Sequence, residues 1–200
     1  MADLKVRHLV VGAVATNCYI AENRKTKEAL IIDPGDKEDG VVPVAVLLTH
    51  GHFDHAMAAQ EVAEQYGIKI YAHETEKETL ETPQVNLSGM IGRTLTFHAD
   101  CYVKDGEILN LAGFEIRVLH TPGHTQGGVC YYIEEEKALF SGDTLFCQSV
   151  GRTDFPTGKS STLIHSIQDK LMPLPDDTMV YTGHEDMTTI GMERKYNPFL

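Results

Sequence analysis

The residues T-H-G-H-F-D-H at 49–55 place three histidines and one aspartate within seven positions, directly after the apolar run Val44–Leu48. Imidazole nitrogens and carboxylate oxygens are the ligands that Zn²⁺ and related ions prefer, and a strand end can present several together. A hydrophobic core disfavours this cluster, because Asp54 adds a charge that is costly to bury without a partner. The other interpretation is a polar loop in which Asp54 caps a helix beginning near His55. The spacing favours a metal site.

Three further loops each follow an apolar run and each contain one residue of a metal-binding type. Taken alone, each has a structural interpretation, such as a surface histidine or an aspartate in a local turn. Together with the 49–55 cluster, they predict four loops that converge on one edge of a sheet structure. The adjacent glycines 123, 142 and 183 would let the backbones approach closely there. The three residues are His124 in H-T-P-G-H-T-Q-G, Asp143 in F-S-G-D-T-L-F and His184 in Y-T-G-H-E.

The elements that must position these loops are visible in the hydrophobic pattern. The run 44–48, the helical spacing at His55–Tyr66 with Gly67 as its C-cap, and the run Ile68–Ala72 predict a parallel strand–helix–strand unit. Ligands of such units gather at the carboxyl ends of the strands, where the histidine cluster lies. Further strands are predicted at Val6–Val14, Asn17–Ala21, Ala29–Asp33, Ile108–Leu111, Phe114–Leu119, Val129–Ile133, Ala138–Phe140 and Met179–Thr182.

The remaining segments complete one compact α/β domain spanning residues 1–200. Glu74–Glu81 is predicted to be a short charged helix, and Ser160–Leu171 a helix with one apolar face. The segment Thr82–Asp105 has weak periodicity, so we expect it to form a loop at the rim of the site.

Composition limits the classes of partner. Seventeen basic against 29 acidic side chains give a formal charge of −12, which disfavours nucleic acid or an anionic membrane as a partner. The N-terminus lacks the layout of a secretory signal, and no apolar run has the length of a membrane span. The four cysteines are widely spaced and form no C-x-x-C pair, so we expect reduced thiols and a cytoplasmic location.

These motifs together resemble the metallo-β-lactamase fold superfamily. The order T-H-G-H-F-D-H, T-P-G-H-T, S-G-D-T-L-F and T-G-H is similar to that of its glyoxalase II (hydroxyacylglutathione hydrolase) branch. The resemblance implies a four-layer αβ/βα sandwich, with two mixed sheets flanked by helices, and two adjacent divalent metal ions. Zinc is the expected metal, and iron or manganese could take its place according to supply.

The resemblance also implies a ligand set and a reaction. His50, His52 and His124 would hold the first ion, Asp54, His55 and His184 the second, and Asp143 would bridge both. A hydroxide shared by the two ions would attack a thioester such as S-lactoylglutathione, and Asp54 could also orient that hydroxide.

Two departures from the family bear on the substrate. Long glyoxalase II enzymes carry a C-terminal helical domain that grips glutathione, whereas this sequence ends at Leu200 and resembles the short bacterial type. Arg152, in V-G-R-T-D-F-P, lies where the long enzymes place a basic substrate contact, so we predict that it binds an anionic group. A structural Arg152–Asp154 pair is the other interpretation. Between Gly35 and Val44 there is room for a turn where the family usually has a helix.

Several other functions compete with thioester hydrolysis. A mononuclear iron persulfide dioxygenase of the same fold shares G-R-T-D-F with residues 151–155. β-Lactam hydrolysis, another ester or lactone hydrolysis, nuclease action and a non-enzymatic metal-binding module are less favoured. We expect a small-molecule thioester as partner, of which a glutathione thioester is one candidate, and a monomer or small homo-oligomer. The histidines outside the ligand pattern are predicted to be structural or surface residues: His8, His73, His98, His120 and His165.

Overall fold

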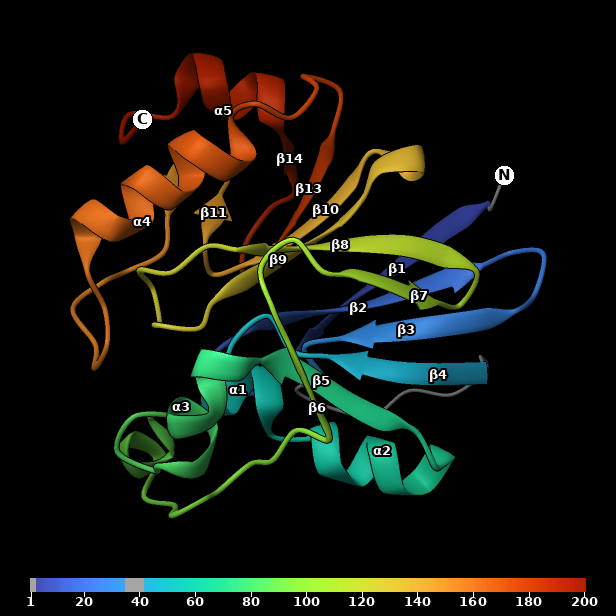
Figure 1. Ribbon diagram of the computed structural model, residues 1–200. Coiled ribbons are helices and arrows are strands. Elements are labelled where there is room, and N and C mark those ends of the chain that lie inside the picture. The colour runs from blue at the N-terminus through green and yellow to red at the C-terminus, as the bar shows by residue number, and fades with distance from the viewer. Residues whose placement is uncertain (1–2, 35–41) are drawn as a thin grey trace.

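Two six-stranded sheets pack face to face in the computed structural model, which describes residues 3–34 and 42–200 (Figure 1). Both sheets are mixed, because antiparallel hairpins flank the parallel pairs β3–β4, β4–β5, β5–β6 and β10–β13. The first sheet has the order β1 (Leu4–Val11), β2 (Thr16–Asn23), β3 (Glu28–Ile32), β4 (Val42–Leu47), β5 (Lys69–His73) and β6 (Cys101–Val103). The second has the order β14 (Thr188–Thr189), β13 (Met179–Thr182), β10 (Ala138–Gly142), β9 (Val129–Ile133), β8 (Phe114–His120) and β7 (Ile108–Leu111).

The central core lies between the two sheets. Leu30 and Leu47 of the first sheet pack in one cluster with Phe114, Tyr131 and Phe140 of the second. Strand β8 shows how the sequence produces this arrangement, since its residues alternate between buried and exposed at its start. Such alternation is typical of a strand with one face on the core and one face toward water.

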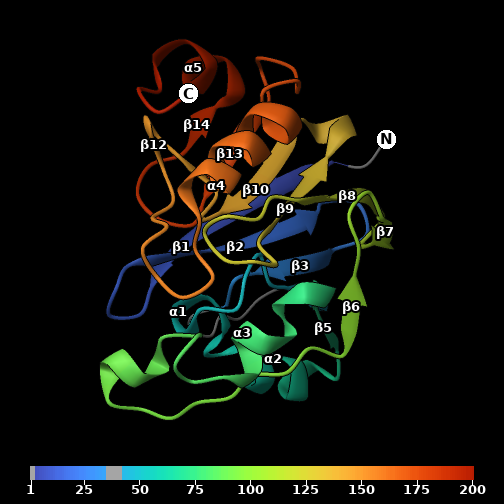
Figure 2. The ribbon, with the colours of Figure 1, turned by 60° about the vertical axis from the view of Figure 1, so that its left-hand side comes forward.

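Helices cover the outer faces of both sheets. Val46 of β4 packs against Val62 of α2 (Ala59–Tyr66), and α3 (Lys77–Glu81) lies on the same side. On the opposite side, Leu139 of β10 packs against Leu163 of α4 (Ser160–Ser166), and α5 (Ile190–Tyr196) adjoins it (Figure 2). The layers are therefore helix, sheet, sheet, helix, and the predicted α/β sandwich with two mixed sheets is confirmed.

The helix predicted at His55–Tyr66 is wrong as a single element. Two helices occupy the region, α1 (Phe53–Ala56) and α2, with a break at Ala58. The Ala58 N–H donates to the carbonyl of Pro34 at 3.0 Å, so a contact distant in sequence replaces a helical hydrogen bond. Gly67 ends α2 with φ +67°, as its predicted C-cap role requires.

Other elements follow the prediction with small changes. The helix predicted at 160–171 is α-helical to Ser166 and continues as a π-helical turn, η4 (Ile167–Leu171). The charged helix predicted at 74–81 begins as a 3-10 turn, η1 (Glu74–Glu76), before α3. The prediction of a turn between Gly35 and Val44 falls mostly on residues 35–41, outside the described residues. The sequence did not predict α5 and several short elements: β6, β14, β11 (Leu145–Phe146), β12 (Ser149–Val150), η2 (Ser88–Ile91) and η3 (Glu134–Glu136).

Two expectations about the whole chain can be compared with the structure. Within residues 3–34 and 42–200, no helix has both the length and the apolar character that crossing a bilayer requires. The four cysteines, all among the described residues, form no disulfide with one another, and Cys18 and Cys130 are buried.

Candidate metal centre

The loop that follows β4 carries the first two histidines of the cluster. Strand β4 runs through the buried residues Val46 and Leu47, and the chain then turns so that His50 and His52 become almost fully buried. Gly51 between them packs closely, because a Cβ atom there would lie 3.1 Å from the Leu80 backbone nitrogen. A small residue at this position thus lets the loop fold against α3.

Helix α1 supplies the next two residues of the motif. His52 occupies its N-cap position without a side-chain capping bond, and Asp54 lies in the first turn, so the proposed role of Asp54 as the N-cap is wrong. The Asp54 carboxylate instead accepts a hydrogen bond of 2.8 Å from the Thr16 hydroxyl and lies 3.3 Å from His184 Nε2. The short helix therefore directs Asp54 and His55 toward the other loops.

The remaining three predicted residues come from the second sheet. His124 lies between β8 and β9, Asp143 directly after β10, and His184 after β13. The glycines of these loops allow close approach, as predicted: a Cβ atom on Gly142 would lie 2.2 Å from the Thr49 hydroxyl oxygen, and one on Gly183 would lie 2.1 Å from Asp143 Oδ1. Both sheets thus contribute to one site at their shared edge.

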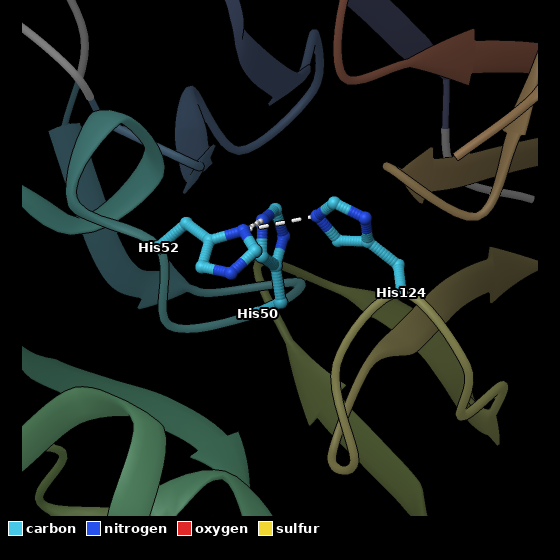
Figure 3. Close-up of side chains that lie close together, drawn as sticks. All are labelled: His50, His52 and His124. Atoms are coloured by element: carbon cyan, nitrogen blue, oxygen red, sulfur yellow. Dashed lines mark hydrogen bonds between the residues drawn. The ribbon is translucent and has the colours of Figure 1, made fainter. Parts of the chain in front are cut away.

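The seven side chains converge. His52 Nδ1 lies 3.1 Å from His50 Nε2 and 2.9 Å from His124 Nε2, and the three rings point toward one another (Figure 3). Their ligand atoms form one compact group, and those of Asp54, His55 and His184 form another, with all atoms of each group within 4.8 Å. Tetrahedral zinc with Zn–N bonds near 2.0 Å holds its ligand nitrogens about 3.3 Å apart, so both groups have the right size.

Asp143 lies between the two groups. Its Oδ2 is 3.4 Å from His124 Nε2 and 3.6 Å from His184 Nε2, and its Oδ1 is 3.4 Å from His55 Nε2. One carboxylate therefore reaches histidines of both groups, which is the geometry that a bridging ligand needs.

Hydrogen bonds on the far side of three rings orient their free nitrogens inward. The Nδ1 of His124 donates to the carbonyl of Arg152 at 2.7 Å, and that of His184 donates to the carbonyl of Ala15 at 3.2 Å. His55 Nδ1 lies 2.9 Å from Asp33 Oδ2. Because Nδ1 carries the proton in each ring, the neutral tautomer leaves a lone pair on Nε2.

Burial and charge determine which groups hold protons. Burial, with the neighbouring His124, lowers the pKa of His52 to about 3, and burial holds the pKa of His50 well below its usual value. For His55, burial acts in the same direction, but Asp54, Asp143 and Asp33 outweigh it and raise its pKa well above the usual value. Burial would raise the pKa of Asp54, yet His55 and His184 keep it far below the usual range.

The residues fit a pair of divalent cations. Within the described chain, Asp143 Oδ1 is a buried atom without a hydrogen-bond partner. The Nε2 lone pair of His124 faces His52 Nδ1 at 2.9 Å, and that of His184 faces His55 Nε2 at 3.4 Å. Only a shared proton or a cation between the two nitrogens stabilises such a contact. Carboxylates beside neutral imidazoles are the donors that Zn²⁺, Fe²⁺ and Mn²⁺ accept.

Two buried carboxylates that the sequence analysis missed support the ligand loops. Asp33 accepts hydrogen bonds from the Thr49 backbone N–H at 2.8 Å and the Thr49 hydroxyl at 2.6 Å, besides its contact with His55. Glu76 accepts from the Gly51 N–H at 2.9 Å and from the Thr125 hydroxyl at 3.1 Å. It therefore joins the loop of His50 and His52 to that of His124. The D-P-G sequence after β3 could have indicated Asp33, but no sequence pattern separates Glu76 from its exposed neighbours.

A cavity of about 580 Å³ opens beside the candidate metal-binding residues. Leu87, Met90 and Ile91 line it, so the predicted rim loop at 82–105 does border the site. Arg152 also lines the cavity, and its guanidinium makes two hydrogen bonds to Asp154, of 2.8 Å and 2.7 Å. The structural Arg152–Asp154 pair, which was the other interpretation of Arg152, is therefore present. Binding of a substrate anion by Arg152 stays a prediction.

His73 and His120, expected to be structural, stack with ring centroids 4.0 Å apart, outside the cluster. Burial, with the neighbouring His120, lowers the pKa of His73 to about 4, so this ring is neutral at physiological pH.

Comparison with known proteins agrees with this geometry. The family model of the Metallo-beta-lactamase superfamily matches residues 11–184. The hydroxyacylglutathione hydrolase GloC of Haemophilus influenzae is 37% identical over 209 residues, which cover 98% of both chains. The crystal structure of BLEG-1 B3 metallo-beta-lactamase superposes with a TM-score of 0.93 at 41% identity, covering 98% of this chain and 99% of that one. TTHA1623 in a di-iron-bound form gives a TM-score of 0.84 at 33% identity, covering 97% and 100%.

The chain therefore belongs to the metallo-beta-lactamase superfamily. Within it, the similarity to GloC and the histidine–aspartate cluster make it a metallo-hydrolase.

Proposed function

We propose that this protein is a thioester hydrolase of the glyoxalase II type that works with two divalent metal ions, zinc being the expected metal. The observation that carries the proposal is the position of Asp143, whose carboxylate lies within 3.6 Å of histidines from both ligand groups. His50, His52 and His124 would hold one ion, and Asp54, His55 and His184 the other. The similarity to GloC supports this class of substrate, and the di-iron form of TTHA1623 supports a site for two ions.

The side chains of the cluster and the adjacent cavity would support thioester hydrolysis. When bound, two divalent cations supply a strong nucleophile from water at neutral pH and polarise the substrate carbonyl. Asp54, whose carboxylate accepts a hydrogen bond from the Thr16 hydroxyl, would serve as a ligand and would orient that water. Thioester cleavage releases a thiolate, which leaves without strong acid assistance, so the reaction does not require a dedicated acid. The cavity beside Asp143 is large enough to admit a small thioester.

The test combines metal analysis with a substrate panel on the same purified protein. We expect two metal ions per chain and hydrolysis of S-lactoylglutathione or a simpler thioester, detected as release of free thiol. Asp143→Asn is the informative variant, because it keeps the size of the side chain but weakens a ligand shared by both groups. It should lose most of the metal and the activity together.

Other outcomes would point to other members of the fold. One iron per chain with oxygen uptake on glutathione persulfide would identify a dioxygenase. BLEG-1 is a metallo-beta-lactamase, so the panel includes a chromogenic β-lactam. Turnover of the β-lactam without turnover of any thioester would overturn the proposal.

A further inference from the structure

Apolar side chains dominate the cavity beside the metal-binding residues. They come from four parts of the chain: the β1–β2 turn, the start of α1, the segment around η2, and the segment from β11 to the residues after β12. Figure 2 shows the β1–β2 turn and the η2 turn on the same side of the molecule. The apolar lining residues are Val14, Phe53, Leu87, Met90, Ile91, Phe146, Val150 and Phe155.

The apolar wall reaches both ligand groups. The Phe155 ring stands edge-on to His52, with centroids 6.0 Å apart, and the Phe146 ring stands edge-on to His184 at 6.1 Å. A substrate whose carbonyl lies at the metal-binding residues would therefore place its flanking groups directly against these two phenylalanines.

The rim of the cavity exposes further apolar surface. Met90 is 70% exposed, Val14 47% and Ile91 42%. A single exposed apolar residue is ordinary, but three of them around one cavity are typical of a surface that a ligand covers.

Cationic groups for a charged substrate are scarce in this cavity. Of the described residues that line it, Arg152 alone carries a lysine or arginine charge. Its guanidinium is bound to Asp154 and lies 3.9 Å from the centroid of the Phe155 ring, so its charge is already compensated. Glu185 adds a carboxylate to the lining. A glutathione thioester, with two carboxylates on its thiol, would meet few partners here.

We infer that the preferred substrate is an uncharged thioester with an alkyl chain, bound along the wall of Phe146, Phe155, Met90 and Ile91. The inference rests on the proposed hydrolysis for the reaction and on the cavity lining for the selectivity. Water adds to the carbonyl carbon and the C–S bond breaks, which yields a carboxylic acid and a thiol. The alkyl chain belongs to either the acyl group or the thiol, and the experiment below separates these two sources.

Two series of thioesters test the inference on the metal-loaded protein. The first varies the acyl group from acetyl to octanoyl on N-acetylcysteamine, and the second varies the thiol from ethanethiol to hexanethiol on an acetyl group. Each buried methylene contributes roughly a two- to fourfold gain, depending on how fully it leaves water. We therefore expect kcat/KM to rise at least tenfold from two to six carbons in one series, and to exceed the value for S-lactoylglutathione.

Two variants test whether the apolar lining of the cavity causes the rise of kcat/KM with chain length. In the double variant Met90→Gln/Ile91→Asn, both changes are on exposed side chains, so the fold should be retained. The ratio of kcat/KM for the six-carbon substrate to that for the two-carbon substrate should fall at least threefold. Met192→Gln is the matched control, because Met192 is also exposed but lies on α5, outside the cavity lining. It should keep the wild-type ratio.

Binding of uncleavable S-alkyl thioethers of N-acetylcysteamine provides a readout that does not depend on turnover. A chain-length gain in affinity without any hydrolysis would support the apolar site and overturn the proposed function. Hydrolysis with a flat chain-length profile and a preference for S-lactoylglutathione would overturn the inference and leave the proposed function standing. Flat affinity together with no hydrolysis would overturn both.

Discussion

Replacing Asp33 by asparagine should weaken metal binding at the group formed by Asp54, His55 and His184. Asp33 Oδ2 lies 2.9 Å from His55 Nδ1 and accepts a 2.6 Å hydrogen bond from the Thr49 hydroxyl. Asparagine is uncharged and has one acceptor oxygen where Asp33 uses two, Oδ1 for the Thr49 backbone N–H and Oδ2 for the Thr49 hydroxyl and His55, so the hold on the His55 ring is weakened. The backbone is not a complication: Asp33 has φ +52°, and asparagine adopts this left-handed region as readily as aspartate.

The expected size of the effect follows from the burial of the group. Asp33 is 1% exposed and His55 is fully buried, so the weakened hydrogen bond is a charged one between two buried side chains. Loss of such a bond costs about 1.5–3 kcal/mol of unfolding free energy. Residues that orient a metal-binding histidine typically change metal affinity by about 10- to 100-fold when they are replaced. We expect a loss of this size for one of the two ions.

Stepwise zinc binding in competition with a chromogenic chelator measures the two affinities separately. Asp177→Asn is the matched control, because Asp177 is an exposed aspartate paired with Lys137 that lies before the start of β13, whereas His184 follows the end of that strand. The control should bind both ions as the wild type does. If Asp33→Asn also bound both ions within twofold of the wild-type affinity, the orienting role of Asp33 would be refuted.

Three further predictions concern the supports of the site and the core. Burial raises the pKa of Glu76 to about 7 from 4.5, so the folded carboxyl keeps a proton that the unfolded one releases, and folding weakens as pH rises through this interval. In urea unfolding of the metal-free proteins, the unfolding free energy of the wild type should therefore fall by roughly 3 kcal/mol relative to that of Glu76→Gln between pH 4.5 and 7.5. A difference between the two proteins that stays constant with pH would contradict this prediction. Gly183→Ala places a Cβ atom 2.1 Å from Asp143 Oδ1, so elemental analysis should find less bound metal than in wild type, and full occupancy would show that the loop can shift without cost. Leu163→Ala empties a fully buried position under β10 and should cost about 3 kcal/mol, lowering Tm by about 8 °C in calorimetry; a wild-type Tm would mean that the core closes over the gap.

The sequence predicted the parts of this molecule that depend on local pattern. The ligand types directly follow apolar runs that form buried strands, so strand topology alone brings the loops of His50, His124 and Asp143 to one edge. The break at Ala58 was not predictable, because it depends on the carbonyl of Pro34, which is distant in the chain. Glu76 belongs to the run E-T-E-K-E, and its burial depends on donors from Gly51 and Thr125 that the pattern does not reveal.

The seven converging side chains are proposed to form a site for two ions that work together in hydrolysis. The most direct measurement is a titration of metal-free protein with zinc, in which thioester turnover is recorded after each addition. Turnover should rise with the metal content and reach its plateau at two equivalents per chain. A plateau at one equivalent, or full metal binding without turnover of any thioester, would contradict a two-ion hydrolase.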